Sequence, residues 1–435
     1  MFEKDLQSKK AIFISGHTGW GKTTAVIDWL NTSNRSYEYF CADQQDFADC
    51  LSEVTGEIVV IDDLHCLMSR AEQLILNALI APGNRRFIII SRGVLPGFLK
   101  PFQLKSQLTV YDIESLRFDR SMISELLVLH KLIAPTLPSQ VEHITNGYVI
   151  AVRFLINRLA NGAPMDTHTV ERARIDVFDF YDEILFKRWD SDLQKFLLHM
   201  APFDRFTEKM AGMVTGRKNV VSTIEKALSG GSYFTFQPPD FYSVHPLFHN
   251  YLMRKQRLIC AQDFIASTYH NAALYYELED DIENALKYYQ LSGDTDKISE
   301  LLILNSQLHP GNGHYYETET YYRVLPKETI LASPALMSGM CMLCSLCCQP
   351  EESESWFSEL ENYAVRLDKS DKNYELAQGQ LCYLKIALPH RGNKRLAAIL
   401  LDAAKAYRKG SFHLQEFSVT SNMPSVINGG KDFCE

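Results

Sequence analysis

The fold of the first part of this chain is decided by Gly16-His17-Thr18-Gly19-Trp20-Gly21-Lys22-Thr23, which fits the pattern G-x-x-x-x-G-K-[ST] in full. The apolar run Ala11–Ser15 precedes this stretch, and the helical candidate Thr23–Leu30 follows it. A strand, a glycine-rich loop and a helix in this order are the context that a phosphate loop requires. The sequence therefore predicts a phosphate-binding loop at the start of a helix.

Each part of this loop has a chemical task in binding a nucleotide. The glycines let the backbone turn so that successive N–H groups point at the β-phosphate, and the positive end of the following helix faces the same anion. Lys22 should reach the β- and γ-phosphates, and the Thr23 hydroxyl should be a Mg²⁺ ligand. We expect ATP or ADP, with Mg²⁺, to be held by Gly16, Gly19, Gly21, Lys22, Thr23 and Thr24.

Two more apolar runs end in charged residues: Ile58–Ile61 before Asp62 and Asp63, and Phe87–Ser91 before Arg92. Unbroken apolar strands are typical of a parallel sheet covered by helices, so we expect an α/β domain. A carboxylate at the end of a central strand can hold Mg²⁺, which suits Asp62, while Asp63 is placed to orient or deprotonate an attacking water. Arg92 is a candidate γ-phosphate sensor, although an arginine at a solvated strand end is an open alternative.

The middle of the chain has a different pattern. Helical segments run over residues 121–160 and again over 177–228. The short β-like pieces Tyr233–Phe236 and Phe241–Val244 follow, and then a helix from His245. Helices followed by a small hairpin and another helix suit a winged-helix module. A lone histidine beside apolar residues is most often structural, so the residues alone leave the role of His245 open.

After about residue 257 the chain is predicted to consist of paired helices. The pairs are Asp263–Leu278 with Ile282–Leu291, Pro334–Cys348 with Glu351–Leu367, and Tyr374–Leu388 with Lys394–Arg408. Helical hairpins that recur about every 35–45 residues are typical of a solenoid of the tetratricopeptide type. The C-x-x-C-x-x-C spacing within Cys341–Cys348 suggests a metal or iron–sulfur site. Because these cysteines lie in one apolar helical run without turn residues, we favour core packing.

Composition limits the class of protein. The chain has 435 residues with 46% hydrophobic and 22% charged residues, which indicates several globular domains. Its net charge of −9 argues against the whole stretch binding nucleic acid. The N-terminus carries acidic residues where a signal peptide would not, the apolar run Ala335–Cys348 is too short for a membrane span, and ten scattered cysteines suggest reduced thiols. We expect a soluble cytoplasmic protein without membrane contact.

Taken in order, these segments resemble the STAND class of signalling ATPases, and more narrowly the MalT-like branch of LuxR-type bacterial transcription regulators. The segments that carry the resemblance are Ser15–Thr24, Val60–His65, Ile89–Arg92, Thr145–Val152, His245–Phe248 and Leu325–Leu336. The resemblance implies a P-loop domain over residues 1–112, a helical lid over 113–170, a winged helix over 171–257 and a TPR-like sensor over 258–435. Only ten residues precede the first strand, whereas the family usually has a segment there that helps to hold the adenine. Fewer residues separate Lys22 from Asp62 than we expect for the MalT-like branch, which suggests that a helix–strand unit between them is shortened.

The resemblance also implies a mechanism. ADP would be held between the nucleotide domain and the winged helix, where His245 would contact its β-phosphate. An inducer, a small molecule or a protein, would bind the repeats and favour an ATP form that self-associates, with hydrolysis at most a slow reset. The family's C-terminal helix-turn-helix is not found in this sequence, so we expect a partial chain that meets DNA only through a domain beyond residue 435. The alternatives are a signalling ATPase or repeat scaffold that binds proteins without DNA and, less favoured, a P-loop enzyme such as a kinase.

Overall fold

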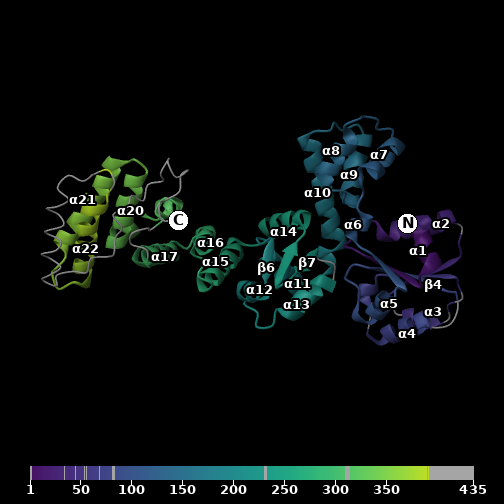
Figure 1. Cartoon of the computed structure of the whole chain (residues 1–435). Helices are drawn as coiled ribbons and strands as arrows, with labels where there is room; N and C mark the ends of the chain where they lie inside the picture. The colour runs from purple at the N-terminus through teal and green to yellow at the C-terminus, as the bar shows by residue number, and fades with distance from the viewer. Residues whose placement is uncertain are drawn as a thin grey trace. The chain divides into compact units, whose positions relative to one another are not determined.

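The chain folds into two compact units, the first ending at Cys260 and the second beginning at Ala261 (Figure 1). The computed structural model describes residues 2–390 apart from gaps at 34, 45, 53, 55, 68, 81–83, 230–232, 309–313 and 389. The helix expected over Lys394–Arg408 lies outside these residues. Each unit is therefore described separately over this part of the chain.

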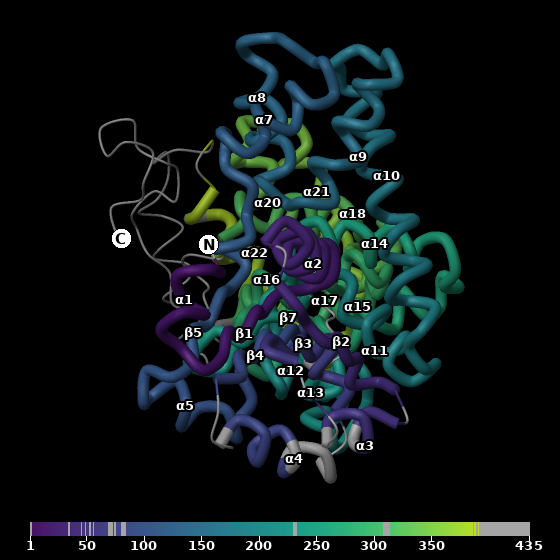
Figure 2. The backbone as a smooth tube through the Cα atoms, turned by 90° about the vertical axis from the view of Figure 1, so that its right-hand side faces the viewer, coloured from purple at the N-terminus to yellow at the C-terminus, as the bar shows by residue number. Residues whose placement is uncertain are grey.

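The first unit begins with a five-stranded parallel sheet in the order β2-β3-β4-β1-β5, which can be followed across Figure 2. Its strands are β1 (Ala11–Ser15), β2 (Tyr37–Cys41), β3 (Ile58–Asp62), β4 (Arg86–Ser91) and β5 (Leu108–Tyr111). The three apolar runs of the sequence are the three central strands, as predicted. The sequence did not reveal β2 and β5, because these edge strands are only partly buried and lack continuous apolar character.

Helices cover both faces of this sheet. They are α1 (Phe2–Ser8), α2 (Lys22–Ser33), α3 (Phe47–Ser52), α4 (Ser69–Ile80) and α5 (Lys100–Leu104), with 3-10 turns η1 (Leu64–Cys66) and η2 (Gly97–Leu99). In Figures 1 and 2, α2 lies on one side of the sheet and α3 to α5 on the other. Between Lys22 and Asp62 the chain forms both β2 and the short helix α3. The helix–strand unit expected here is therefore short but present.

The short N-terminal segment forms a helix of its own. In α1, Phe2 and Leu6 are buried. The Phe2 ring lies edge-on to Trp29 and Tyr111, with centroids 5.7 and 5.6 Å apart. These edge-to-face contacts are a favoured aromatic geometry. The helix α1 therefore packs against α2 and the edge strand β5.

A lid of helices follows the sheet. It contains α6 (Ile113–Leu116), α7 (Arg120–Leu129), α8 (Leu137–Thr145), α9 (Val149–Ala160) and α10 (Thr167–Ile184). Asp119 and Asp166 cap α7 and α10 by accepting hydrogen bonds from backbone N–H groups. Gly147 has φ +68°, and a Cβ there would approach the Phe118 carbonyl oxygen to 2.4 Å. The turn that starts α9 therefore requires glycine.

The first unit ends in a small winged-helix domain. Its elements are η3 (Phe186–Arg188), α11 (Ser191–Met200), β6 (Arg205–Thr207), α12 (Glu208–Thr215), α13 (Val221–Ser229), β7 (Phe234–Gln237), β8 (Phe241–Val244) and α14 (Pro246–Ile259). The strands form an antiparallel sheet in the order β6-β8-β7. The expectation of a helical block over 177–228 is wrong at β6, where residues 205–207 form a strand. Three residues are too short to show a period of their own, and they are held by pairing with β8.

The second unit is helical throughout its described residues. It contains α15 (Gln262–Leu278), α16 (Ile282–Ser292), α17 (Thr295–Leu308), α18 (Glu319–Val324), α19 (Lys327–Leu331), α20 (Pro334–Leu346), α21 (Pro350–Arg366) and α22 (Lys372–Ala387). The pairs α15–α16 and α20–α21 pack as expected, whereas the sequence did not indicate α17 to α19. In α20, Cys341 and Cys344 are buried in the core. Cys347 and Cys348 follow the end of this helix, and the first is half-buried and the second exposed. This distribution favours the core-packing interpretation of the first two cysteines.

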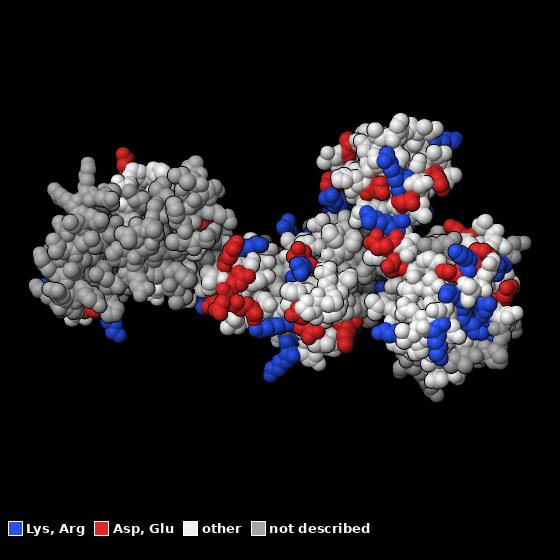
Figure 3. All heavy atoms as spheres, in the orientation of Figure 1, with Lys and Arg blue, Asp and Glu red and all other residues white. Residues whose placement is uncertain are grey.

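The helices and the surface charge bear on membrane and nucleic-acid binding. Over the described part of the chain, no helix combines the length and apolar character needed to cross a bilayer. On the face drawn in Figure 3, the coloured residues carry both acidic and basic side chains, with a group of acidic ones left of centre and several basic ones on the part at the right.

Candidate nucleotide-binding site

The phosphate loop joins β1 to α2, and its backbone conformation depends on glycine. Gly19 and Gly21 have φ angles of +86° and +73°, in the left-handed region that glycine adopts most easily. A Cβ at Gly19 would also approach the Tyr148 hydroxyl oxygen of the lid to 2.5 Å. Position 19 therefore requires glycine for both its backbone angle and the close approach of the lid.

Lys22 lies at the start of α2 and points back into the loop. Its side-chain ammonium donates hydrogen bonds to the carbonyl oxygens of Gly16 at 2.5 Å and His17 at 3.0 Å. The residue is only 8% exposed. Burial, with a further contribution from the Arg92 charge, lowers the pKa of Lys22 to about 8. This cation is poorly solvated, so an incoming anion would interact with it strongly.

Thr23 and Asp62 form the polar pair expected at a magnesium site. The Thr23 hydroxyl donates to Asp62 Oδ2 at 2.7 Å, and the Tyr39 hydroxyl donates to the same oxygen at 2.8 Å. The other Asp62 oxygen accepts from the Asp63 backbone N–H at 2.7 Å. A hydroxyl and a buried carboxylate are oxygen ligands of the kind that Mg²⁺ prefers. The residues present therefore fit this ion, and the sequence missed only Tyr39, which comes from the edge strand β2.

Asp63 lies between two basic side chains. Its Oδ1 is 3.5 Å from Arg92 Nε and 3.7 Å from His65 Nδ1. Burial raises the pKa of Asp63, and the Arg92 charge opposes this effect. Burial also lowers the pKa of His65 to about 4, so this imidazole is neutral near neutral pH. Arg92 is thus the nearest cationic side chain to Asp63, and it offsets part of the effect of burial on this carboxylate.

These groups share a cavity of about 620 Å³. It is lined by Gly19, Gly21, Lys22, Thr23, Thr24, Asp62, Asp63 and Arg92. Gly16 does not line the cavity, but its carbonyl oxygen accepts a hydrogen bond from Lys22. The structure thus brings together every site residue expected from the sequence except His245.

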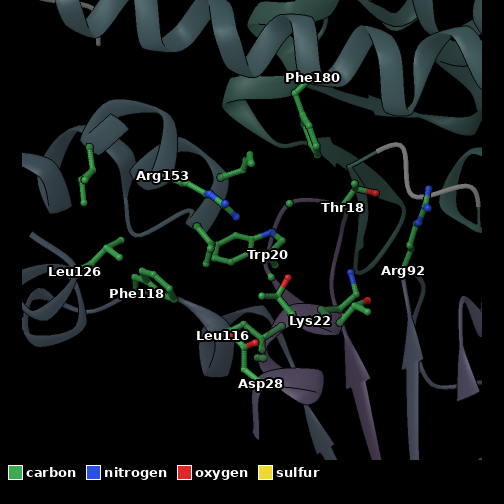
Figure 4. A pocket seen from close by; sticks show the side chains of 18 of the residues that line it. Thr18, Trp20, Lys22, Asp28, Arg92, Leu116, Phe118, Leu126, Arg153 and Phe180 are labelled. Atoms are coloured by element: carbon green, nitrogen blue, oxygen red, sulfur yellow. The ribbon is translucent and has the colours of Figure 1, made fainter. Parts of the chain in front are cut away.

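The other end of the cavity is formed by residues that the sequence did not single out. Its apolar lining includes Leu116, Phe118, Leu126, Ile156 and Phe180, and its polar lining includes Asp28, Arg153 and Asn157. In Figure 4, Phe118 and Leu126 lie on the opposite side of Trp20 from Lys22 and Arg92. An apolar slot with a few polar groups suits a flat heterocyclic base. The spacing of Val149, Arg153 and Ile156 on one face of α9 is the signal that could have indicated this wall.

His245 borders a second cavity, of about 310 Å³, between the lid and the start of α14. Trp20 and Tyr148 also line this space. The His245 ring centroid is 5.8 Å from each of the Tyr148 and Tyr233 rings. Burial lowers the pKa of His245 to about 4, and its Nδ1 has no hydrogen-bond partner among the described residues. His245 is therefore neutral near neutral pH and lies close to the side chains that contact the phosphate loop.

The fold and the site together define a class of protein: a P-loop α/β domain followed by a helical lid, a winged-helix domain and a helical C-terminal region. Residues 181–262 match a family model described as the MalT winged helix domain. This match covers α11 to α14 and the β6-β8-β7 sheet.

Two curated relatives and one solved structure extend the comparison. The HTH-type transcriptional regulator MalT of Vibrio campbellii (strain ATCC BAA-1116) is 20% identical over 383 residues, which are 75% of this chain and 42% of that protein. MalT of Vibrio parahaemolyticus serotype O3:K6 (strain RIMD 2210633) is 20% identical over 351 residues, 67% of this chain and 38% of that protein. The RuvB Holliday junction branch migration motor of Thermotoga maritima has a TM-score of 0.33 at 15% identity, covering 56% of this chain and 87% of that one. The chain thus spans less than half the length of the curated relatives.

Proposed function

We propose that this chain is the nucleotide-dependent switch of a MalT-like transcription regulator of the STAND class, in the LuxR family. The observation that carries the proposal is that three parts of the first unit meet at one loop. Lys22, Thr23 and Asp62 of the nucleotide domain line the cavity, while the lid and the winged helix both donate hydrogen bonds to carbonyl oxygens of the phosphate loop. A nucleotide bound there can influence the position of the winged helix, and the winged helix can influence nucleotide affinity in return.

In this proposal each site residue acts on a different part of the bound nucleotide. Lys22, Thr24 and the loop glycines bind the phosphates, and Arg92 reads the γ-phosphate. Thr23 and Asp62 would hold Mg²⁺, which neutralises phosphate charge when it is bound. Asp63 orients the attacking water. Because Arg92 lies 3.5 Å from the Asp63 carboxylate, this base is restrained, which suits a slow reset better than rapid turnover.

The two nucleotides would then favour two forms of the protein. ADP holds the closed form, in which the winged helix contacts the phosphate loop, and His245 reports on ADP. ATP favours an open form that self-associates. The size of the response depends on the difference in affinity of each nucleotide for the two forms.

The remaining assignments rest on the relatives and the resemblance. We propose that residues 258–435 belong to a TPR-like sensor that takes the inducer, with residues 1–112, 113–170 and 171–257 as the preceding domains. The boundary at 257 lies three residues before the break between the two compact units at Cys260. DNA would be contacted through a helix-turn-helix domain outside these 435 residues, and the protein would act in the cytoplasm. The curated relatives, both named as HTH-type transcriptional regulators, favour this proposal over a scaffold that never contacts DNA.

Substitution of His245 tests the switch. The change H245L should speed ADP dissociation about fivefold and alter ATP binding less, because a buried hydrogen bond is worth about 1 kcal/mol and His245 is proposed to act in the closed form. Release of fluorescent ADP and ATP analogues, followed by stopped flow, measures both effects. His249 is the matched control, since it lies one turn after His245, also has an unpartnered buried side-chain nitrogen among the described residues, and lines neither cavity. Equal effects of H245L on both nucleotides, or the same effect from H249L, would return His245 to a structural role.

A further inference from the structure

The Thr18 carbonyl of the phosphate loop accepts hydrogen bonds from two other parts of the first unit. The Tyr148 hydroxyl of the lid donates to this oxygen at 2.8 Å, and the Tyr233 hydroxyl of the winged helix donates to it as well. The two hydroxyl oxygens are also within hydrogen-bond distance of each other, at 2.7 Å, so the two hydroxyl protons are shared among three contacts. The next carbonyl, that of Gly19, accepts from the backbone N–H of Ile150 at 3.0 Å. Two successive carbonyls of the loop are thus bound from outside the nucleotide domain.

These contacts determine the direction in which the loop presents its N–H groups. A peptide unit is planar and trans, so its N–H points opposite to its C=O. Holding the Thr18 and Gly19 carbonyls toward the lid and winged helix turns the N–H groups of Gly19 and Trp20 the other way. Converging N–H groups in such a turn form an anion-binding concavity. A loop that is already so oriented loses less freedom when a phosphate binds, and its affinity is higher for that reason.

Tyr233 is well placed to maintain this orientation. It is fully buried, and its ring centroid lies 4.7 Å from that of His17 and 5.0 Å from that of Phe248. Burial raises the pKa of both Tyr148 and Tyr233 well above the ordinary value, so both hydroxyls remain hydrogen-bond donors across the usual pH range. These contacts hold the Tyr233 ring in place, and the ring in turn directs its hydroxyl at the Thr18 carbonyl oxygen.

We propose that Tyr233 is a positioning residue for the phosphate loop, which orients the loop for the β-phosphate while the winged helix contacts it. Tyr148 belongs to the lid and keeps its bond to Thr18 whether or not the winged helix is in place. Tyr233 belongs to the winged helix and loses its bond when that domain leaves. Tyr233 thereby makes phosphate affinity depend on the position of the winged helix. This inference rests on the proposed switch and adds the residue through which the winged helix acts.

The experiment compares three tyrosine-to-phenylalanine variants, each of which removes one hydroxyl and keeps the ring. Affinities for ADP, ATP and adenosine are measured by competition with a fluorescent ADP in the presence of Mg²⁺. For Y233F we expect ADP affinity to fall about 3- to 10-fold, the range for one buried hydrogen bond, with ATP affected less and adenosine unchanged. For Y148F, ADP and ATP should fall alike. Y242F is the matched control, because Tyr242 is also a buried tyrosine of the winged helix but its hydroxyl donates to Glu208 at 2.9 Å and not to the phosphate loop.

Several outcomes overturn the inference. The first is an unchanged ADP affinity in Y233F. The second is an equal loss of adenosine affinity in Y233F, which would indicate a general structural role. The third is an equal loss of ADP affinity in Y242F. If Y233F does not fold, Y148F decides, and unchanged ADP affinity in that variant contradicts the role of the Thr18 carbonyl. Failure of the proposed function is recognised separately, since the wild-type protein would then not bind ADP in a manner that depends on Lys22.

Discussion

The two ends of the large cavity differ in how they are built. The phosphate end is polar, and most of its residues come from one continuous stretch, Gly16–Thr24, with Asp62, Asp63 and Arg92 at neighbouring strand ends. The lid end is largely apolar, and its residues come from the segment after β5, from α7, from α9 and from α10. The first end is built mainly by a local motif whose chemistry suits an anion, whereas the second is formed only when distant segments pack together. Substitutions at the two ends should therefore affect nucleotide binding independently of each other.

The largest effect should come from Lys22→Ala at the phosphate end. Loss of a charged hydrogen bond in a buried site costs about 3 kcal/mol, so ADP affinity should fall at least about 100-fold. Adenosine affinity should change less than about threefold, because Lys22 faces the phosphates. Isothermal titration with ADP, and competition for adenosine, measure the two values. Lys9→Ala is the control, since Lys9 lies in the same domain and outside the cavity. Surviving ADP affinity in K22A would show that the site is wrongly assigned.

This difference between the ends also explains how much the sequence could predict. The P-loop and the strand ends at Asp62 and Arg92 follow local rules, because a motif and an apolar run fix both the element and its terminus. Tyr39 was missed because β2 is an edge strand with little apolar signal. Phe118 and Arg153 were missed for another reason. Their place in the cavity depends on how the lid helices pack on the sheet, which no local pattern records. Tyr233 likewise acquires a role only through contact with Thr18, 215 positions earlier in the chain.

A smaller effect should follow from Phe118→Ala at the lid end. Removing an aromatic ring from the apolar slot should cost about 1.4 kcal/mol, or roughly tenfold in affinity. The loss should be the same for ADP, ATP and adenosine, because all three carry the base. Phe118→Leu retains apolar volume and should lose less. A loss for ADP that spares adenosine would mean that the base does not bind at this end.

The smallest effect should come from pH. The pKa of Lys22 is lowered to about 8 in the free protein, and a bound phosphate would raise it again. The complex therefore binds more protons than the free protein above pH 8, so ADP affinity is full below this pH and declines above it. We expect ADP affinity to fall about fourfold between pH 7 and pH 8.5, and adenosine affinity to remain unchanged. A titration series across this range checks the slope, and a flat ADP profile would contradict the role given to the Lys22 charge.

The central claim is that the first unit holds a nucleotide in a closed resting form. The most direct measurement is to denature freshly purified protein and to identify and quantify the released nucleotide by chromatography. We predict ADP in near-stoichiometric amount with the wild-type chain and none with K22A. Wild-type protein that releases no nucleotide after mild purification, and that then shows no affinity for added ADP with Mg²⁺, would contradict this claim.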